Sequence, residues 1–166
     1  MVDVTEPRWL NPAEMRAWLA YRRLRALLDL QITRDLAADS GLSDADYDVL
    51  STVSERPGRR MRLGELADEI RWSVSRLSHH VSRMEQRGLV VRETCADDGR
   101  GQTVVLTDAG WDAIRAAAAH HVASVREHFV DLLTPEEIDA FAATAEKVVA
   151  HLNQVTSPTP ARSGRR

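Results

Sequence analysis

The feature that most restricts the possible folds is a single hairpin signal between two helical halves of the chain. Two short runs rich in β-branched residues, 89–95 (LVVRETC) and 102–107 (QTVVLT), flank the turn-forming stretch 96–101 (ADDGRG). On either side of this hairpin, apolar residues recur every three or four positions, which is the period of an amphipathic α-helix. The sequence therefore predicts a mainly α protein with one small β-hairpin wing.

Capping residues mark where the helices begin and end. Asn11 and Thr134 each precede a proline and have a glutamate three residues later, whereas Ser43 has Asp46 in the corresponding place. Gly88 is a typical C-terminal stop. Helices are predicted over residues 12–39, from 44 to a stop at 56–58, and over 63–70, 74–87, 108–133 and 135–155.

The order of these elements is that of a winged helix-turn-helix. Three helices followed by a hairpin, over residues 43–107, form a lobe whose last helix before the hairpin would enter the DNA major groove. The long amphipathic helices at 11–39 and 108–155 carry more apolar surface than such a lobe covers, so we expect them to form a helical dimerisation region. Residues 1–10 and 156–166 are predicted to be flexible ends.

The distribution of charge favours a nucleic-acid partner although the net charge of −3 does not. Residues 71–92 contain five arginines and one acid, whereas residues 107–155 contain eight acids and three cations. A local basic segment of this kind is the electrostatic footprint of a DNA-binding surface, and the charge of the whole chain conceals it.

The helix predicted at 74–87 separates into an apolar and a basic face. Its expected buried side chains are Val74, Leu77, Val81 and Met84. The opposite face has hydroxyls, amides and cations but no carboxylate, and consists of Ser75, Arg76, His79, Ser82, Arg83 and Gln86. Such a face suits phosphates and base edges. The alternative is an ordinary solvated helix face.

Four segments of the chain resemble landmarks of the MarR family of winged-helix transcriptional regulators. They are 41–53 (GLSDADYDVLSTV), 63–70 (LGELADEI), 73–93 (SVSRLSHHVSRMEQRGLVVRE) and 97–110 (DDGRGQTVVLTDAG). The similarity extends over residues 15–152. It implies a homodimer that binds pseudo-palindromic operators in double-stranded DNA, as a repressor relieved by a small aromatic ligand or by cysteine oxidation.

The resemblance and the helix pattern together assign a DNA-binding surface. Residues near the start of the 74–87 helix would read base edges, with Arg76 a candidate for guanine, and Arg83 would bind a phosphate or hold the wing. The resemblance places Arg100 in the minor groove and pairs Asp98 with a recognition-helix arginine, for which Arg83 is the expected match. The predicted DNA-contacting set is Ser73, Ser75, Arg76, Ser78, His79, Arg83 and Arg100, with Asp98 as wing anchor.

The pair His79-His80 departs from the family pattern and is also assigned to groove contacts. Two other readings of the 96–101 stretch are a plain hairpin turn and a calcium loop, for which the acids are too few. A long cation between two glycines has the reach to follow a groove.

Two regulatory sites are further hypotheses. Trp18, Arg22, Tyr47 and Trp111 could line a pocket for a phenolate or carboxylate ligand, although residues of this kind more often belong to the core. Cys95 lies at the end of the first hairpin strand, where oxidation could move the wing, or where it simply packs. As a lone cysteine it excludes an internal disulfide and agrees with a reducing compartment.

Several other classes of function are disfavoured. We find no phosphate-binding glycine loop, nucleophile elbow or paired carboxylates, so an enzyme, a cofactor and a metal are not expected. His120, His121 and His128 lack the spacing of a helical metal pair. The chain has no apolar run of 18 residues and no signal peptide, which predicts a cytoplasmic protein without membrane contact. A winged-helix protein-interaction module without DNA binding would carry acids or apolar residues on the outer face of residues 75–86.

Overall fold

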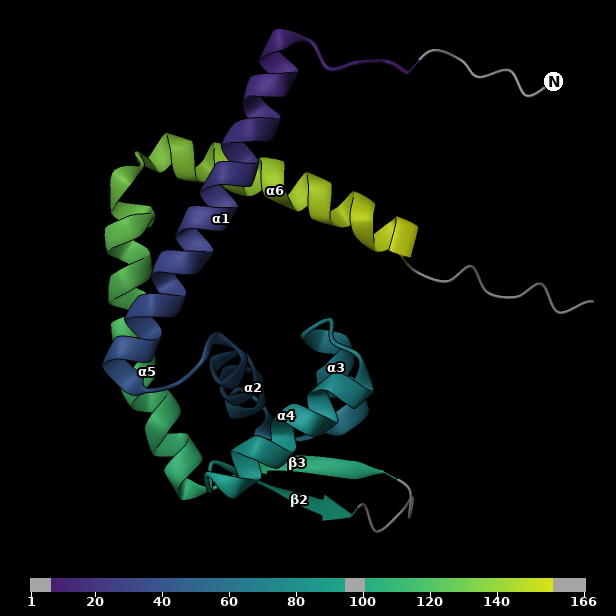
Figure 1. The fold of residues 1–166 in the computed structure, drawn as a ribbon, viewed down its shortest axis with the longest axis vertical. Helices are drawn as coiled ribbons and strands as arrows, with labels where there is room; N and C mark the ends of the chain where they lie inside the picture. Colours follow the sequence, from purple (N-terminus) through teal and green to yellow (C-terminus); the bar gives the residue numbers. More distant parts are fainter. Residues whose placement is uncertain (1–6, 95–100, 157–166) are drawn as a thin grey trace, which may run out of the picture. The chain divides into compact units, whose positions relative to one another are not determined.

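The computed structural model describes residues 7–94 and 101–156 (Figure 1). Its elements are α1 (Pro12–Ser40), α2 (Asp44–Ser54), η1 (Pro57–Arg59), β1 (Arg60–Arg62), α3 (Leu63–Glu69), α4 (Val74–Gln86), β2 (Val90–Thr94), β3 (Gln102–Leu106), α5 (Asp108–His128), η2 (Val130–Leu132) and α6 (Pro135–Thr156). They form two compact units, residues 1–125 and 126–166. Asp98, Arg100 and Cys95 lie outside the described residues. The prediction of a mainly α winged helix is confirmed.

The β-sheet has one strand more than the sequence indicated. Strands β2 and β3 form the predicted antiparallel hairpin, with Val90 opposite Leu106 and Arg92 opposite Val104. A third strand, β1, pairs with the other edge of β3, so that the sheet order is β1-β3-β2. Strand β1 is only three residues long, and a single side chain, Met61, is buried in it. Such a short strand has no period by which it could be recognised.

The core lies inside the first unit, where α2, α3 and α4 pack against the sheet and against one another. Fully buried side chains from all four contribute to it: Val49, Leu50, Val53, Leu66, Leu77, Val81, Met84, Val90 and Val104. Leu36 of α1 and Ile114 and Ala117 of α5 belong to the same cluster. The three helices and the wing are therefore one packed body, and α4 is held on its apolar side.

The prediction that Val74 is on the buried face of α4 is wrong. Val74 is 51% exposed, whereas His80, which we assigned to groove contacts, is only 6% exposed. Val74 is the first residue of α4 and lies beyond the edge of the core. His80 is three residues after Leu77 and four before Met84, so that it shares their face.

The predicted helix caps are present. Asn11 and Ser43 form capping boxes with Glu14 and Asp46 respectively. Thr134 exchanges the same pair of hydrogen bonds with Glu137. Three further cap features match the sequence: the Ser73 hydroxyl accepts from the start of α4, Thr107 caps α5, and Gly88 follows α4 at φ 72°.

The helix predicted over residues 108–133 ends early. Helix α5 stops at His128, and Phe129 has a non-helical backbone before the short η2 turn. The Phe129 ring contacts Phe141 of α6 edge to face, with centroids 5.2 Å apart, inside the second unit. We attribute the early end to this aromatic contact. None of the helices in the described ranges combines the length and the apolar character needed to cross a bilayer.

The start of α5 is fitted closely to the end of the α4–β2 turn. The Thr107 hydroxyl donates to the Gly88 carbonyl (2.6 Å) and accepts from the Gly110 amide (3.0 Å). A Cβ atom at Gly110 would lie 1.9 Å from the Leu89 carbonyl oxygen, which no real contact allows. Gly110 is therefore required for close approach of two backbones.

We predict that Gly110→Ala lowers the free energy of unfolding by about 1–3 kcal/mol because the backbones must separate. In an ordinary helix interior the same change would raise it by about 1 kcal/mol. The control is Ala116→Gly at an exposed position of α5, which should cost about 1 kcal/mol from helix propensity alone. Urea denaturation measures both, and a stabilised Gly110→Ala variant would contradict the packing.

Candidate nucleic-acid interface

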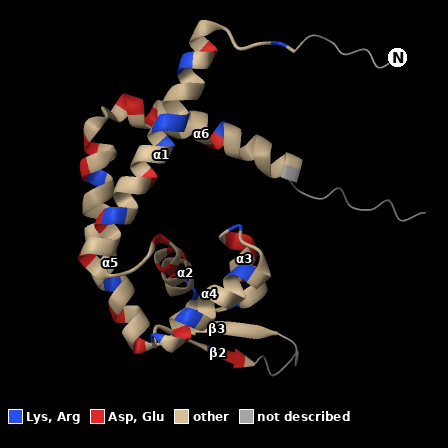
Figure 2. Ribbon diagram, in the orientation of Figure 1, with Lys and Arg blue, Asp and Glu red and all other residues tan. Residues whose placement is uncertain are grey.

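The outer face of α4 is exposed and carries no acid. The exposed side chains predicted to contact DNA from this helix are Ser75, Arg76, His79 and Arg83, while Ser78 is half-buried. The contrast with α5 and α6, where acidic residues outnumber basic ones, can be followed in Figure 2. Ser73 is exposed, but its hydroxyl accepts a hydrogen bond from the Arg76 amide (3.2 Å) and so caps the helix. The structure thus places these side chains together on one surface.

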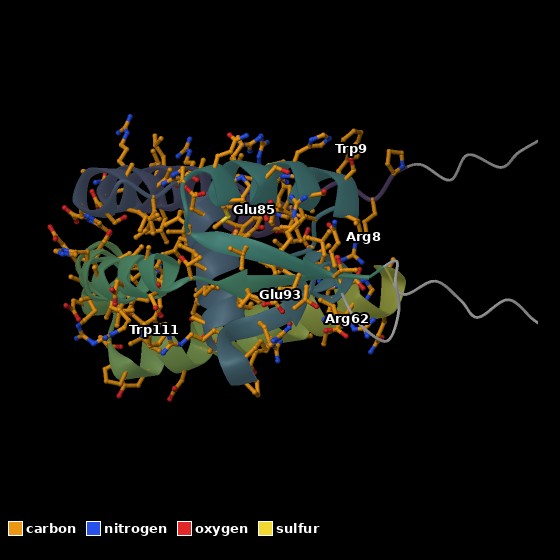
Figure 3. All side chains as sticks on the ribbon, turned by 90° about the horizontal axis from the view of Figure 1, so that it is seen from below. Arg8, Trp9, Arg62, Glu85, Glu93 and Trp111 are labelled. Carbon is orange, nitrogen blue, oxygen red and sulfur yellow. The ribbon has the colours of Figure 1, made fainter. Side chains whose placement is uncertain are left out.

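Arg92 of β2 joins the wing to α4. Its guanidinium donates to the Ser78 carbonyl (2.5 Å) and to the Ser82 hydroxyl (2.7 Å). The Glu85 carboxylate accepts from the Arg92 amide (2.9 Å) and lies 3.3 Å from Nε of the same residue. Glu85 is labelled on α4 in Figure 3. These bonds fix the position of β2 against α4.

The sequence did not reveal Arg92 as the residue that holds the wing. We assigned this role to a pair between Asp98 and Arg83, and Asp98 lies outside the described residues. The signal that could have found the Arg92 contact is the acid-to-base spacing from Glu85 to Arg92 in MEQRGLVVR. This spacing runs from the end of a helix to the start of a strand, so neither the helical nor the strand repeat predicts that the two side chains meet.

A buried carboxylate, Asp46, connects α2 to α4. Its Oδ2 accepts from the Ser43 amide (3.0 Å), the Ser43 hydroxyl (2.8 Å) and the Arg87 guanidinium (2.7 Å). Its Oδ1 lies 3.1 Å from Nε2 of His80. Burial raises the pKa of Asp46, but the hydrogen bonds from Arg87 and Ser43 outweigh it, and the net pKa is lowered. Asp46 is therefore ionised at neutral pH.

His80 is neutral, and its tautomer follows from its neighbours. Burial lowers the pKa of His80 and the positive charge of Arg83 lowers it further, against the opposite effect of Asp46. The Arg83 guanidinium lies 2.9 Å from Nδ1 of His80. Because a guanidinium only donates, Nδ1 must accept, which leaves the proton on Nε2 facing Asp46. His80 thus supports Arg83 from below instead of contacting a groove.

Arg76 is stacked on a tryptophan in the turn before α4. The central carbon of its guanidinium lies 3.9 Å from the centroid of the Trp72 ring. The Trp72 ring meets His80 edge to face, with centroids 5.5 Å apart. Trp72 was not among the predicted site residues, although it stands four residues before Arg76.

The structure does not form one pocket from the four predicted ligand residues. Two contacts show that helices α1 and α5 run antiparallel. Asp39 lies 3.8 Å from His120, and four residues earlier on α1 the Asp35 carboxylate accepts from Ser124, four residues later on α5 (2.6 Å). Trp18 is 17 residues before Asp35, about 25 Å along α1. Trp111 is 13 residues before Ser124, about 20 Å along α5 in the opposite direction.

The individual contacts agree with this separation. Trp18 stacks on Tyr21, and Tyr47 contacts His121 with the two rings tilted, while Arg59 covers the Trp111 ring at 3.8 Å. Arg22, four residues after Trp18, is exposed on α1. Within one chain these four residues therefore do not line a common pocket, and the ligand site stays a prediction. Apolar periodicity identified the aromatic positions but not how far along the helices they lie from one another.

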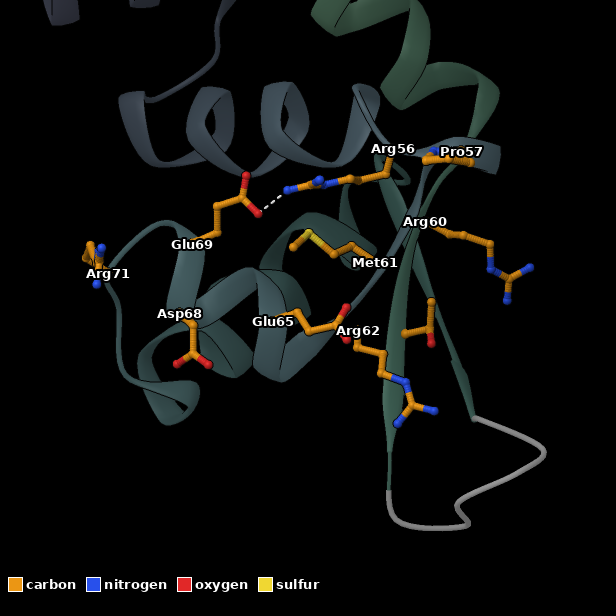
Figure 4. Close-up of a pocket in the computed structure, with 10 residues that line it drawn as sticks. Arg56, Pro57, Arg60, Met61, Arg62, Glu65, Asp68, Glu69 and Arg71 are labelled. Carbon is orange, nitrogen blue, oxygen red and sulfur yellow. Dashed lines mark hydrogen bonds and ion pairs between the residues drawn. The ribbon is translucent and has the colours of Figure 1, made fainter. Parts of the chain in front are cut away.

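A cavity of about 820 Å³ lies instead between β1 and α3 (Figure 4). Four arginines and three acids are among its lining residues: Arg56, Arg60, Arg62, Arg71, Glu65, Asp68 and Glu69. Arg56 pairs with Glu69 across it, and Arg60 pairs with Glu93 of β2. The run 56–62 (RPGRRMR) is the sequence signal for this basic cluster, which our prediction omitted. In the described ranges, no group of three or more histidine, cysteine and acidic residues could hold a metal ion.

Comparisons of sequence and structure find transcriptional regulators. The MarR family model matches residues 40–101. The chain is 33% identical over 131 residues to the transcriptional regulator HosA of Escherichia coli O157:H7, and the match covers 78% of this chain and 94% of HosA.

Solved structures of similar fold are also transcriptional regulators of this family. AbsC, a MarR family transcriptional regulator from Streptomyces coelicolor, is 42% identical with a TM-score of 0.85, over 89% of this chain and 99% of AbsC. Sco3205, a MarR family regulator from the same organism solved in complex with DNA, is 37% identical with a TM-score of 0.84, over 96% and 97% of the two chains.

The chain belongs to the MarR family of transcriptional regulators. Identity and coverage extend far beyond the helix-turn-helix, which confirms the family that the sequence motifs indicated. Members of this family are regulators and not enzymes, as expected from the sequence.

We predict that His80 makes the stability of the fold depend on pH. The pKa of His80 is lowered in the folded chain and returns to about 6.5 on unfolding, so below 6.5 the unfolded chain binds the proton more readily. The free energy of unfolding should therefore be highest above pH 6.5 and should fall as the pH decreases from 6.5 to the folded-state pKa.

Urea denaturation between pH 5 and 8 measures this dependence. The control is His80→Gln, which retains an amide donor and acceptor but does not titrate. The remaining histidines are common to both proteins, so the difference between the two pH profiles isolates His80. Identical pH profiles would contradict the assigned environment.

Proposed function

We propose that this chain is a sequence-specific DNA-binding repressor that acts as a homodimer on a pseudo-palindromic operator. Helix α4 would enter the major groove, and Arg100 of the wing, outside the described residues, would enter the minor groove. The observation that carries the proposal is the exposed face of α4, where Arg76, His79 and Arg83 lie together without an acid. The DNA complex of Sco3205, 37% identical, supports the same use of this fold.

The rigid support of α4 favours DNA over a protein partner. Asp46 holds the helix from α2 and Arg92 holds it from β2. Arg92 uses the Ser82 hydroxyl of the outer face, whereas neither contact involves Arg76 or His79, which stay exposed to meet a groove. A protein-binding module would be expected to expose acids or a broad apolar patch there, whereas in the described part of α4 the large exposed apolar side chain is Val74 at its first position.

Dimerisation is proposed from the exposed apolar side chains of the long helices. No described residue of α6 is buried in the single chain. Large apolar side chains along it are solvent-exposed, namely Ile138, Phe141, Val148, Val149, Leu152 and Val155. Apart from the contact between Phe141 and Phe129, α6 therefore has little of the tertiary packing that stabilises most helices in water. A second copy of the chain would supply it, and twofold symmetry would match a pseudo-palindromic site.

Regulation by a ligand or by oxidation stays a separate proposal. An aromatic or phenolic effector would need a site to which Trp18 and Trp111 do not both contribute from one chain, because the two lie far apart in it. Cys95, which would carry the redox alternative, is outside the described residues. Peroxide treatment of wild type and Cys95→Ser, followed by a gel shift, distinguishes these two routes.

We predict that Arg83→Ala weakens binding to all DNA sequences and lowers the salt dependence. If Arg83 binds one phosphate, the slope of log K against log salt should fall in magnitude by about 1. The measurement is fluorescence anisotropy at several salt concentrations, with a duplex from upstream of the chain's own gene. Arg115→Ala, which removes an exposed cation of α5, is the matched control and should leave the slope unchanged. An equal slope for wild type and Arg83→Ala would refute the phosphate contact.

We predict a dimer in solution with a mass of about 37 kDa, twice the 18.5 kDa of one chain. Leu152→Glu should shift the population toward the monomer, because a carboxylate would enter the proposed apolar interface. Light scattering after size-exclusion chromatography measures both masses, with Glu146→Gln as a polar control on the same helix. A monodisperse wild-type monomer at micromolar concentration would overturn the dimer.

A further inference from the structure

The indole of Trp72 is held rigidly in the turn between α3 and α4. Its backbone amide donates to the Ala67 carbonyl at the end of α3 (2.9 Å). The preceding residue, Arg71, has φ 58°, a left-handed conformation that turns the chain sharply at this point. The ring packs against the hydrophobic core and meets the buried His80 edge to face. Backbone, core and His80 therefore fix the position of this ring.

The Arg76 guanidinium lies on this fixed ring. The separation of 3.9 Å between its central carbon and the ring centroid is that of a close cation–π contact. Arg76 is in the first turn of α4, where its amide is also tied to the Ser73 cap. A free arginine on a helix surface samples many rotamers, whereas this one has a defined place before any ligand arrives.

A cation–π stack leaves the hydrogen-bonding groups of arginine available. The contact uses the flat face of the guanidinium, whereas its N–H donors lie in the plane and point outward. A salt bridge would instead occupy those donors. Bidentate recognition of guanine needs two of them, directed at O6 and N7. Stacking on Trp72 can thus orient Arg76 without competing with the base.

We propose that Trp72 is a specificity-determining positioning residue, which holds Arg76 in the orientation that reads guanine in the major groove. The proposal rests on the DNA-binding function proposed above and deepens it. Trp72 acts through Arg76, so it contributes to discrimination between bases and leaves the number of phosphate contacts unchanged. Removing the stack is expected to reduce discrimination about two- to fivefold.

The test begins with selection of the preferred site from a random duplex library by wild-type protein. Arg76→Ala then identifies the guanine whose replacement by adenine no longer affects binding. For wild type, Trp72→Leu and Trp72→Phe, anisotropy gives the ratio of affinities for the guanine and adenine sites. We expect Trp72→Leu to lower this ratio about two- to fivefold at an unchanged salt slope, and Trp72→Phe to lie between it and the wild type because phenylalanine is the weaker cation–π partner.

Two controls separate positioning from general damage. Asp48, which lies within electrostatic range of Arg76, is changed to Asn, and this variant should keep the wild-type ratio if the ring holds the arginine. The NMR signal of the Arg76 Nε–H reports the stack directly, because the indole ring current should shift it in wild type and not in Trp72→Leu. Thermal melting checks that each variant is folded.

The outcomes are distinct. The role of Trp72 is overturned if Trp72→Phe keeps the wild-type ratio of affinities for the guanine and adenine sites and the Arg76 Nε–H signal of the wild type shows no ring-current shift. This outcome decides the question even if Trp72→Leu fails to fold. A wild-type ratio in a folded Trp72→Leu overturns it as well. A wild-type protein that selects no preferred sequence overturns the proposed function itself, and the role of Trp72 with it.

Discussion

The buried carboxylate of Asp46 is the interaction on which the geometry of the DNA-binding lobe depends. As the third residue of α2 it completes the capping box with Ser43, and it also accepts a hydrogen bond from Arg87 at the end of α4. Its second oxygen faces His80 in the middle of α4. A charge buried in this way is tolerated only with such partners, so the position of α4 relative to α2 is tightly specified.

Arg92 provides the second support for α4. Its contacts reach the helix at Ser78 and Ser82, which are both half-buried, and not at Arg76 or His79. Glu85, the one acid of α4, is taken up by Arg92 and so does not weaken the positive potential of the exposed side. Asp46 and Arg92 together hold the helix by polar contacts that leave Arg76 and His79 exposed.

Local signals in the sequence predicted most elements, and non-local contacts account for what they missed. Caps such as Asn11 and Thr134 involve residues three positions apart, so a short window contains both partners. The bond between Asp46 and Arg87 spans 41 residues, and no period connects them. The outer face of α4 was predicted because a helix repeats every 3.6 residues. The role of His80 was not, since its acidic partner Asp46 lies on another helix.

The junction at Thr107 and Gly110 has a mechanical consequence for the lobe. The turn after α4 and the first turn of α5 meet there through hydrogen bonds of the Thr107 hydroxyl and through a backbone approach at Gly110 that leaves no room for a Cβ atom. Helix α5, about 32 Å long over its 21 residues, is thus joined closely to the α4–β2 turn at its N-terminal end, so that a displacement of its first turn is expected to carry α4 and β2 with it.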